Sequence, residues 1–151
     1  MTTVQIPESV ENLTLQVRQN IHVRASLEAT FEALLEEMGP ANQTPDGTPI
    51  PMTLEAWPGG RWYRDLGNDN GHFWAHVQAI KRPTLIELVG PMFASFPFLS
   101  NIQYRLTEAD GGTLITFHHL ALGYIQSETR LGVNKGWNWI LERTRKHAEG
   151  N

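Results

Sequence analysis

Cysteine is absent from all 151 residues, which excludes disulfide bonds, zinc–thiolate sites and thiol nucleophiles. The chain has no run of basic residues and its formal net charge is −4, so its charge gives no indication of a nucleic-acid partner. No stretch approaches the roughly 18 apolar residues of a membrane helix, and the amino terminus lacks the apolar core of a secretion signal. These absences predict a soluble cytoplasmic protein that does not insert into a membrane.

The short motifs that commonly mark an active site are missing as well. The sequence contains no G-x-S-x-G, no H-E-x-x-H, no P-loop lysine motif and no G-x-G-x-x-G that opens a helix. Pro58-Gly59-Gly60 predicts a turn rather than a phosphate cradle, because a predicted strand and not a helix follows it. We therefore expect no metal and no cofactor.

The composition that remains is that of an ordinary globular protein, with 40% hydrophobic and 19% charged residues. A chain of this length normally forms one domain and can bury a sizeable core. We expect a flexible, polar segment over residues 1–12 and a single domain over residues 13–148.

Hydrophobic periodicity predicts the order of the elements. The stretch "LTLQVRQNIHVR", residues 13–24, alternates between apolar and polar residues and predicts a strand with one buried face. A helix is expected to begin after the capping residue Ser26 and to end before Gly39. After a proline-rich loop, about six short strands separated by turns lead to a long helix that begins at Ser127. An antiparallel sheet with one wet face needs helices on its other face, so the predicted class is a two-layer α+β domain.

His72 and His76 stand four residues apart, a spacing at which a helix presents two metal ligands on one face. The surrounding pattern predicts a strand instead, where residues four apart are separated by ~13 Å. A single ion needs both nitrogens within ~2.1 Å, so we predict no metal site here. Alternation places Phe73 towards the core and both histidines with Trp74 on the wet face, unless a bulge near Gly71 shifts the register.

Three polar side chains fall on faces that alternation predicts to be buried, namely Arg64, Tyr104 and His119. Arg64 either pairs with a carboxylate such as Glu55 or faces a ligand. The hydroxyl of Tyr104 needs a hydrogen-bonding partner or a ligand. His119 is either a hydrogen-bonded core residue or a base, and it is the best titratable candidate in the chain.

Five segments, taken in order, resemble a known protein family. They are "VRASLEATFEAL", "EAWPGGRWY", "AHVQAIKRPTLIEL", "EADGGTLITFHH" and "GWNWILERT", and the resemblance as a whole covers roughly residues 13–147. The sequence resembles the START-like SRPBCC superfamily, which includes the birch-pollen-allergen-like proteins, and within it the activators of the 90-kDa heat-shock chaperone's ATPase. It departs from that family after the first predicted helix, where "GPANQTPDGTPIP" replaces a tryptophan-rich segment, and it has no room for the additional large domain of the eukaryotic activators.

The resemblance implies a helix-grip fold, in which a curved seven-stranded antiparallel sheet wraps around a long C-terminal helix and leaves a hydrophobic cavity between them. Members of the superfamily mostly bind lipids, polyketides or other apolar molecules, and some are cyclases. The residues that we expect to contact such a ligand are Trp62, Arg64, Phe73, Met92, Phe93, Phe96, Tyr104, Phe117, His119, Val133, Trp137 and Leu141.

Two features allow more than one interpretation. The apolar loop at residues 91–98 is either a lid over the cavity or a plug in the core or an oligomer contact. Gly132 and Gly136 each cost the last helix ~1 kcal/mol relative to alanine. They either allow close packing on the sheet or leave space for a ligand.

Three functions follow from these alternatives. We favour a binding module for a lipid- or polyketide-like molecule, with no enzymatic activity. The second is a cyclase- or hydrolase-type enzyme, in which His119 is the general base and Arg64 or Tyr104 stabilises an anion. The third is a co-chaperone-like protein that binds a partner through the outer sheet face, where Trp57 and Trp74 are expected. Whether the chain forms a homodimer is left open.

Overall fold

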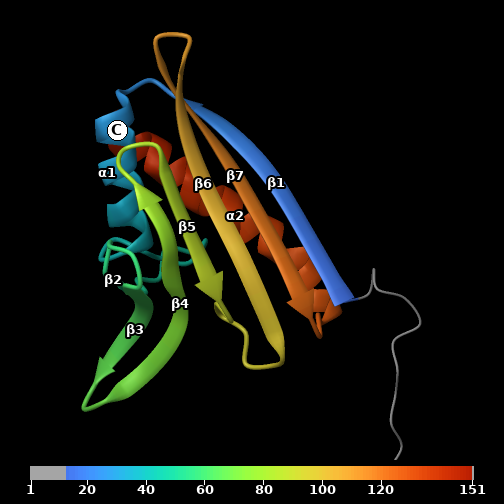
Figure 1. The fold of residues 1–151 in the computed structure, drawn as a ribbon. Helices are drawn as coiled ribbons and strands as arrows, with labels where there is room; N and C mark the ends of the chain where they lie inside the picture. The colour runs from blue at the N-terminus through green and yellow to red at the C-terminus, as the bar shows by residue number, and fades with distance from the viewer. Residues whose placement is uncertain (1–12, 151) are drawn as a thin grey trace, which may run out of the picture.

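The computed structural model describes residues 13–150, so the segment 1–12 that we expected to be flexible lies outside the described residues. These residues form a seven-stranded antiparallel sheet, in the strand order β1-β7-β6-β5-β4-β3-β2, and two helices (Figure 1). The elements in chain order are β1 (Thr14–Val23), α1 (Leu27–Met38), β2 (Thr53–Leu54), β3 (Arg61–Gly67), β4 (Asn70–Lys81), β5 (Leu85–Gly90), β6 (Phe98–Ala109), β7 (Gly112–Gly123) and α2 (Ser127–Ala148). The predicted helix-grip α+β fold is confirmed.

The long helix α2 crosses the inner face of the curved sheet, and in Figure 1 it lies behind the strands. It packs against β1 at one edge of the sheet and against α1. Its buried residues are those that helical spacing predicted: Val133, Trp137, Ile140, Leu141 and Thr144. Neither helix within residues 13–150 combines the length and the apolar character needed to cross a membrane.

The first helix begins and ends where the sequence predicted. The Ser26 hydroxyl accepts a hydrogen bond from the Ala29 amide at 3.1 Å, and Gly39 ends the helix. The indole N–H of Trp62, which is fully buried, donates to the Met38 carbonyl at 2.8 Å. Trp62 thereby satisfies one of the carbonyls that a helix end leaves without an intrahelical partner, and it joins β3 to α1.

The face that alternation assigned to Phe73 is wrong, because β4 contains a bulge. Along β3, the partner on β4 changes from Ala75 to Phe73 in one step after Trp62, so Trp74 is an extra residue. Phe73 is 37% exposed, and its ring packs on His76 with 4.8 Å between the centroids. Trp74 turns to the inner side instead, where its ring centroid lies 5.1 Å from that of Trp62.

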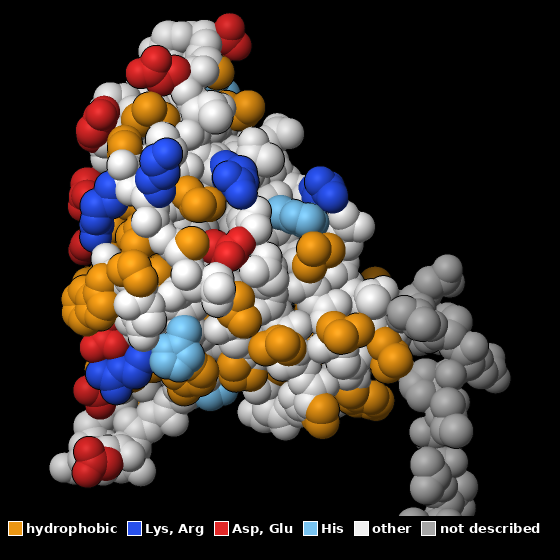
Figure 2. Space-filling view, viewed as in Figure 1, with side chains coloured by type: hydrophobic (Ala, Val, Ile, Leu, Met, Phe, Trp, Pro, Cys, Tyr) orange, Lys and Arg blue, Asp and Glu red, His pale blue; other side chains and the backbone are white. Residues whose placement is uncertain are grey.

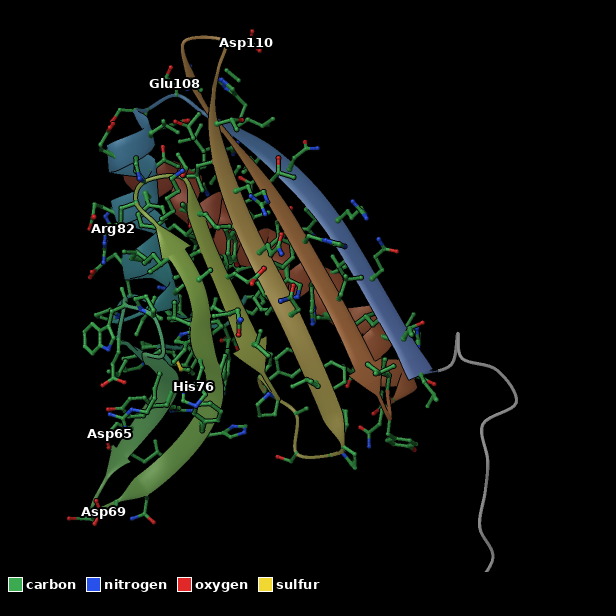
Figure 3. The ribbon with its side chains drawn as sticks, viewed as in Figure 1. Asp65, Asp69, His76, Arg82, Glu108 and Asp110 are labelled. Carbon is green, nitrogen blue, oxygen red and sulfur yellow. The ribbon has the colours of Figure 1, made fainter. Side chains whose placement is uncertain are left out.

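The two histidines of this strand consequently lie in different surroundings. His76 is exposed on the outer face, as predicted, and Figure 3 shows it in front of β4. His72 is half-buried and its ring centroid lies 6.4 Å from that of Trp74. Within residues 13–150, no group of three or more His, Cys, Asp or Glu side chains has a geometry that could hold a metal ion.

The loop between β5 and β6 is held against β4 by backbone contacts. The Met92 amide donates to the Trp74 carbonyl at 2.8 Å, and the Met92 side chain is buried. Gly90 is needed for this approach, since a Cβ there would lie 2.3 Å from the Trp74 carbonyl oxygen. Met92 adopts a left-handed backbone conformation with φ of 58°. The loop therefore begins as part of the core.

We predict that Trp62→Phe lowers the free energy of unfolding by about 2–4 kcal/mol, because it leaves the Met38 carbonyl unsatisfied and removes buried volume. Urea denaturation followed by circular dichroism measures this loss. Trp57→Phe is the matched control, since Trp57 is 58% exposed and its replacement should change stability by no more than about 0.5 kcal/mol. Equal stability of the two variants would contradict the role given to Trp62.

Candidate functional site

A cavity of about 540 Å³ lies between the first half of α2, the loop that follows α1, and the inner side of β4. This volume is within the ~300–1,000 Å³ typical of small-molecule sites. The described residues that line it are mainly apolar: Asn42, Gln43, Thr44, Pro45, Ile50, Trp74, Phe93, Glu128, Thr129, Gly132, Val133, Gly136, Trp137, Trp139 and Ile140.

Two glycines form part of the helical wall of the cavity. A Cβ atom built on Gly132 or on Gly136 meets no heavy atom within 4 Å. Close packing of α2 on the sheet therefore does not explain why the helix carries glycine at these positions. Both residues instead leave open space beside the helix, at a cost in helix propensity of ~1 kcal/mol each.

Aromatic rings form much of the remaining wall. The bulge on β4 brings Trp74 into the cavity, and Phe93 of the β5–β6 loop contacts it with 6.1 Å between the ring centroids. Trp137 of α2 lines the cavity as well and packs its ring on Phe117, with 5.0 Å between the centroids. The loop at 91–98 thus contributes both to the core, through Met92, and to the cavity wall.

The loop after α1 is attached to α2 beside the cavity. The indole N–H of Trp139 donates to the Gln43 carbonyl at 3.2 Å. Within the loop, backbone hydrogen bonds join Ile50 to Asn42 at 2.9 Å and Thr44 to Thr48 at 2.9 Å. These bonds hold the loop as a folded wall.

His119 is fully buried and links α2 to the sheet. Its Nδ1 accepts a hydrogen bond from the indole N–H of Trp137 at 2.9 Å. An indole N–H can only donate, so the proton of the neutral imidazole sits on Nε2, which donates to the Ser100 hydroxyl at 2.8 Å. Burial, and next the charge of His118, lowers the pKa of His119 to about 4. Both ring nitrogens are therefore occupied in a structural hydrogen-bond chain.

The three residues considered as a catalytic group are not all brought together, since Tyr104 and His119 lie on the neighbouring strands β6 and β7 whereas Arg64 is remote from both. Tyr104 is buried on β6, its hydroxyl has no hydrogen-bond partner among the described residues, and burial raises its pKa. Arg64 lies on β3, three strands away from β6, which corresponds to about 14 Å between the strands. Its side chain makes no hydrogen bond or ion pair with residues 13–150, while Glu55 binds Arg61 at 2.7 Å, which lowers the pKa of Glu55 to about 2. None of the three, His119 included, lines the cavity.

The residues expected to contact a ligand fall into three sets. Phe93, Val133 and Trp137 line the cavity. Arg64 and Phe73 lie on the β3–β4 hairpin outside it. The remaining ones belong to the core or pack against it, without lining the cavity: Trp62, Met92, Phe96, Tyr104, Phe117, His119 and Leu141.

Several lining residues were not anticipated from the sequence. Trp74 was assigned to the wet face because strict alternation ignores the bulge at that residue. The loop residues 42–50 follow no periodic pattern, so nothing in their order indicated a cavity wall. Trp139 was recognisable in principle, since it lies two residues after Trp137 in the cavity-facing half of α2.

The outer face of the sheet carries a second apolar feature, at the end of β6 and β7 near the β5–β6 loop. Leu99 pairs in register with Leu122, and Leu120 lies two residues before Leu122 on β7. These three leucines, the outer leucines hereafter, are 55%, 58% and 43% exposed, respectively. Figure 2 shows hydrophobic side chains gathered over this end of the sheet, below a row of basic side chains.

A protein-family model described as "Activator of Hsp90 ATPase homolog 1-like protein" matches residues 24–149 of the chain. The match begins directly after β1 and extends through α2. It therefore covers most of the sheet and both helices. No curated protein matches the sequence closely enough to count as a relative.

Solved structures share the fold at low sequence identity. Ara h 8.0201 is 14% identical with a TM-score of 0.68, over 91% of this chain and 99% of its own. The di-domain ARO/CYC protein StfQ from the steffimycin biosynthetic pathway is 10% identical with a TM-score of 0.68, over 93% of this chain and 52% of its own. The Aha1 dimer from Colwellia psychrerythraea is 16% identical with a TM-score of 0.63, over 89% of this chain and 96% of its own. The chain thus spans about half the length of StfQ.

We predict that His119 makes the folded protein less stable as the pH falls. An exposed histidine in the unfolded chain takes up a proton near pH 6.5, whereas His119 in the fold does so only near pH 4. Stability is therefore complete above about pH 6.5 and falls by on the order of 3 kcal/mol on acidification to about pH 4, since one pKa unit corresponds to ~1.4 kcal/mol. Denaturation of the native protein and of His119→Asn at several pH values measures the difference. Parallel stability curves for the two proteins would contradict the prediction.

Proposed function

The chain belongs to the family of activator of Hsp90 ATPase homolog 1-like proteins, and from its cavity we propose that it binds an apolar small molecule between α2, β4 and the loop after α1. The observation that carries the proposal is the pair of glycines, Gly132 and Gly136, which border open space in a helix. Packing does not require them, and helix stability disfavours them. A ligand bound beside the helix explains why both positions lack a side chain.

The lining of the cavity supports a binding role over a catalytic one. Among the described lining residues, Glu128 alone is ionisable, and it is exposed at the start of α2. General acid–base catalysis needs a titratable group within hydrogen-bond reach of the reacting atoms. The apolar walls offer shape and contact area instead, which suits retention or transport of a molecule.

The comparison with StfQ supports a small organic molecule as the ligand. That protein is a di-domain ARO/CYC from a biosynthetic pathway, so a related fold has a role in small-molecule metabolism. For this chain we propose a lipid- or polyketide-like ligand of similar apolar character. A cyclase- or hydrolase-type reaction in the same cavity has less support, because Arg64, Tyr104 and His119 do not line it.

A second candidate function is binding of a protein partner through the outer leucines, since three exposed leucines lie together on one sheet face. The family description points to an Hsp90-type chaperone, and the Colwellia psychrerythraea structure is a dimer, so a homodimer is the other partner to consider. Direct binding to purified Hsp90 and sedimentation of the protein at several concentrations test the two, with Leu120→Lys as the variant. A monomer that does not bind Hsp90 would remove this candidate.

We predict that Gly136→Leu abolishes ligand binding while it stabilises the free protein. The new side chain fills the cavity, and leucine favours the helix over glycine by about 0.5–1 kcal/mol. Titration with Nile red, an uncharged apolar dye, measures binding by fluorescence, and thermal melting of the free protein measures stability.

Asn138→Leu is the matched control, because Asn138 is exposed on the same helix and does not line the cavity. Its Nile red affinity should equal that of the native protein. Binding that survives in Gly136→Leu, or a native protein that binds neither Nile red nor any co-purifying apolar molecule, would refute the proposed function.

A further inference from the structure

The strand β1 forms a free edge of the sheet. It is ten residues long and pairs with β7 on one side only, and Figure 1 shows it as the outermost strand of the sheet. Its pairing with β7 contains no register shift, and the strand contains no proline. Natural proteins commonly shorten, kink or cover an edge strand, because its unpaired backbone groups can bind another strand. β1 keeps the features of a strand that can pair further.

Alternate residues of β1 direct their backbone groups away from β7. The Val23 carbonyl points towards β7, because a Cβ atom on Gly112 would lie 2.3 Å from its oxygen. The Thr14 carbonyl points the other way and accepts a hydrogen bond from the Arg130 guanidinium of α2 at 2.8 Å. In an antiparallel strand the N–H and C=O groups of one residue point to the same side, and the side alternates along the chain. The even-numbered residues of β1 therefore face the free edge.

Both ends of this edge are closed by side chains, and its middle is open. Arg130 binds the Thr14 carbonyl at one end. At the other end the Arg24 amide donates to the Glu149 carboxylate at 3.0 Å. The residues whose outward backbone groups have no hydrogen-bond partner within residues 13–150, the open residues hereafter, are Gln16, Arg18, Asn20 and His22.

A second copy of β1, related to the first by a two-fold axis at Gln19, fits these open residues. The antiparallel register places Arg18 opposite the partner's Asn20. It also places Gln16 opposite the partner's His22, so that every open residue has a counterpart. An axis at Arg18 or at Asn20 would leave open residues unmatched, and the first would oppose two arginines, which is unfavourable.

The same register matches the apolar residues of the inner face. Val17 lies opposite the partner's Ile21. Leu15 lies opposite the partner's Val23. All four belong to the core or pack against it, and apolar pairs across neighbouring strands stabilise a sheet. The apolar inner layer of one copy would thus continue into that of the other.

The position of α2 leaves room for a second copy. The Trp137 indole binds His119 on β7. One turn earlier, the Asn134 carbonyl accepts from the Gln19 side chain on β1 at 2.9 Å, so α2 lies beneath the space between these two strands. The α2 helices of two copies would be separated by two strand spacings, ~10 Å, a distance typical of packed helices. Leu131 lies beside Asn134 on the helix surface and is 82% exposed, so it offers an apolar contact there.

We infer that the protein forms a two-fold dimer through the free edge of β1, in which the sheets of two copies join into one. The open residues of both copies supply about eight backbone hydrogen bonds, within the range of roughly 5–15 that specific interfaces carry. This interface uses the backbone of β1 rather than the outer leucines or the cavity. It is therefore independent of the proposed ligand.

Sedimentation of the full chain over a series of concentrations tests the inference through variants of Asn20. Asn20→Lys places a lysine opposite the partner's Arg18 twice by symmetry, and it should raise the dissociation constant of the dimer about twofold to thirtyfold. Asn20→Glu should lower it by a similar factor. Asn20→Pro removes an outward N–H that β7 does not need, and it should raise the constant at least about tenfold. Thermal melting shows whether each variant folds.

Leu99→Lys is the matched control, because it adds the same charge to the outer face on β6, two strands away from β1. It should leave the dissociation constant unchanged. Amide hydrogen exchange should show protection of the open residues that increases with protein concentration. A monomer at every concentration, with or without protected edge amides, would overturn the inference. So would a dimer that Asn20→Lys and Asn20→Pro leave intact, or one that Leu99→Lys weakens as much as Asn20→Lys does. Nile red binding reports on the cavity separately in each case.

Discussion

The hydrogen bond from Trp137 to His119 determines where the long helix lies on the sheet. It connects the middle of α2 to β7, and the bond from His119 to Ser100 extends the connection to β6. Among the described residues, no hydrogen bond joins α2 to β3 or β4. The helix packs against β1 and α1 instead. The cavity is the space that this one-sided attachment leaves. Its wall is completed by the loop after α1, which Trp139 fastens to the same helix.

The strands and helices were predictable from the sequence wherever one periodic pattern continued for a whole element. β1 alternates over ten residues, and α2 repeats its apolar residues at helical spacing, so both followed from the order of residues alone. The same reasoning correctly placed Tyr104 and His119 inside, because β6 and β7 pair without a register shift over twelve residues each. Interior position, however, did not distinguish a core residue from a cavity residue.

The cavity was less predictable because it depends on departures from regular structure. A single extra residue on β4 turned Phe73 to the outer face and Trp74 to the inner face, the reverse of the prediction. The alternation of apolar and polar residues does not locate such a bulge. The wall at residues 42–50 depends on a hydrogen bond between the loop and α2, which joins Gln43 and Trp139 across about a hundred positions of sequence. The glycines of α2 were visible in the sequence, but only the open space beside them separates a packing role from a role in ligand binding.

Tryptophan is distributed over this molecule in an unusually informative way. Of the five tryptophans, Trp74, Trp137 and Trp139 line the cavity, whereas Trp57 is exposed to solvent and Trp62 is enclosed in the core. Indole emission depends on the polarity and the quenching groups around the ring. Tryptophan fluorescence should therefore change when a ligand enters the cavity, because three of the five indole rings line it. The protein needs no added label for filling or emptying of the cavity to be followed in real time.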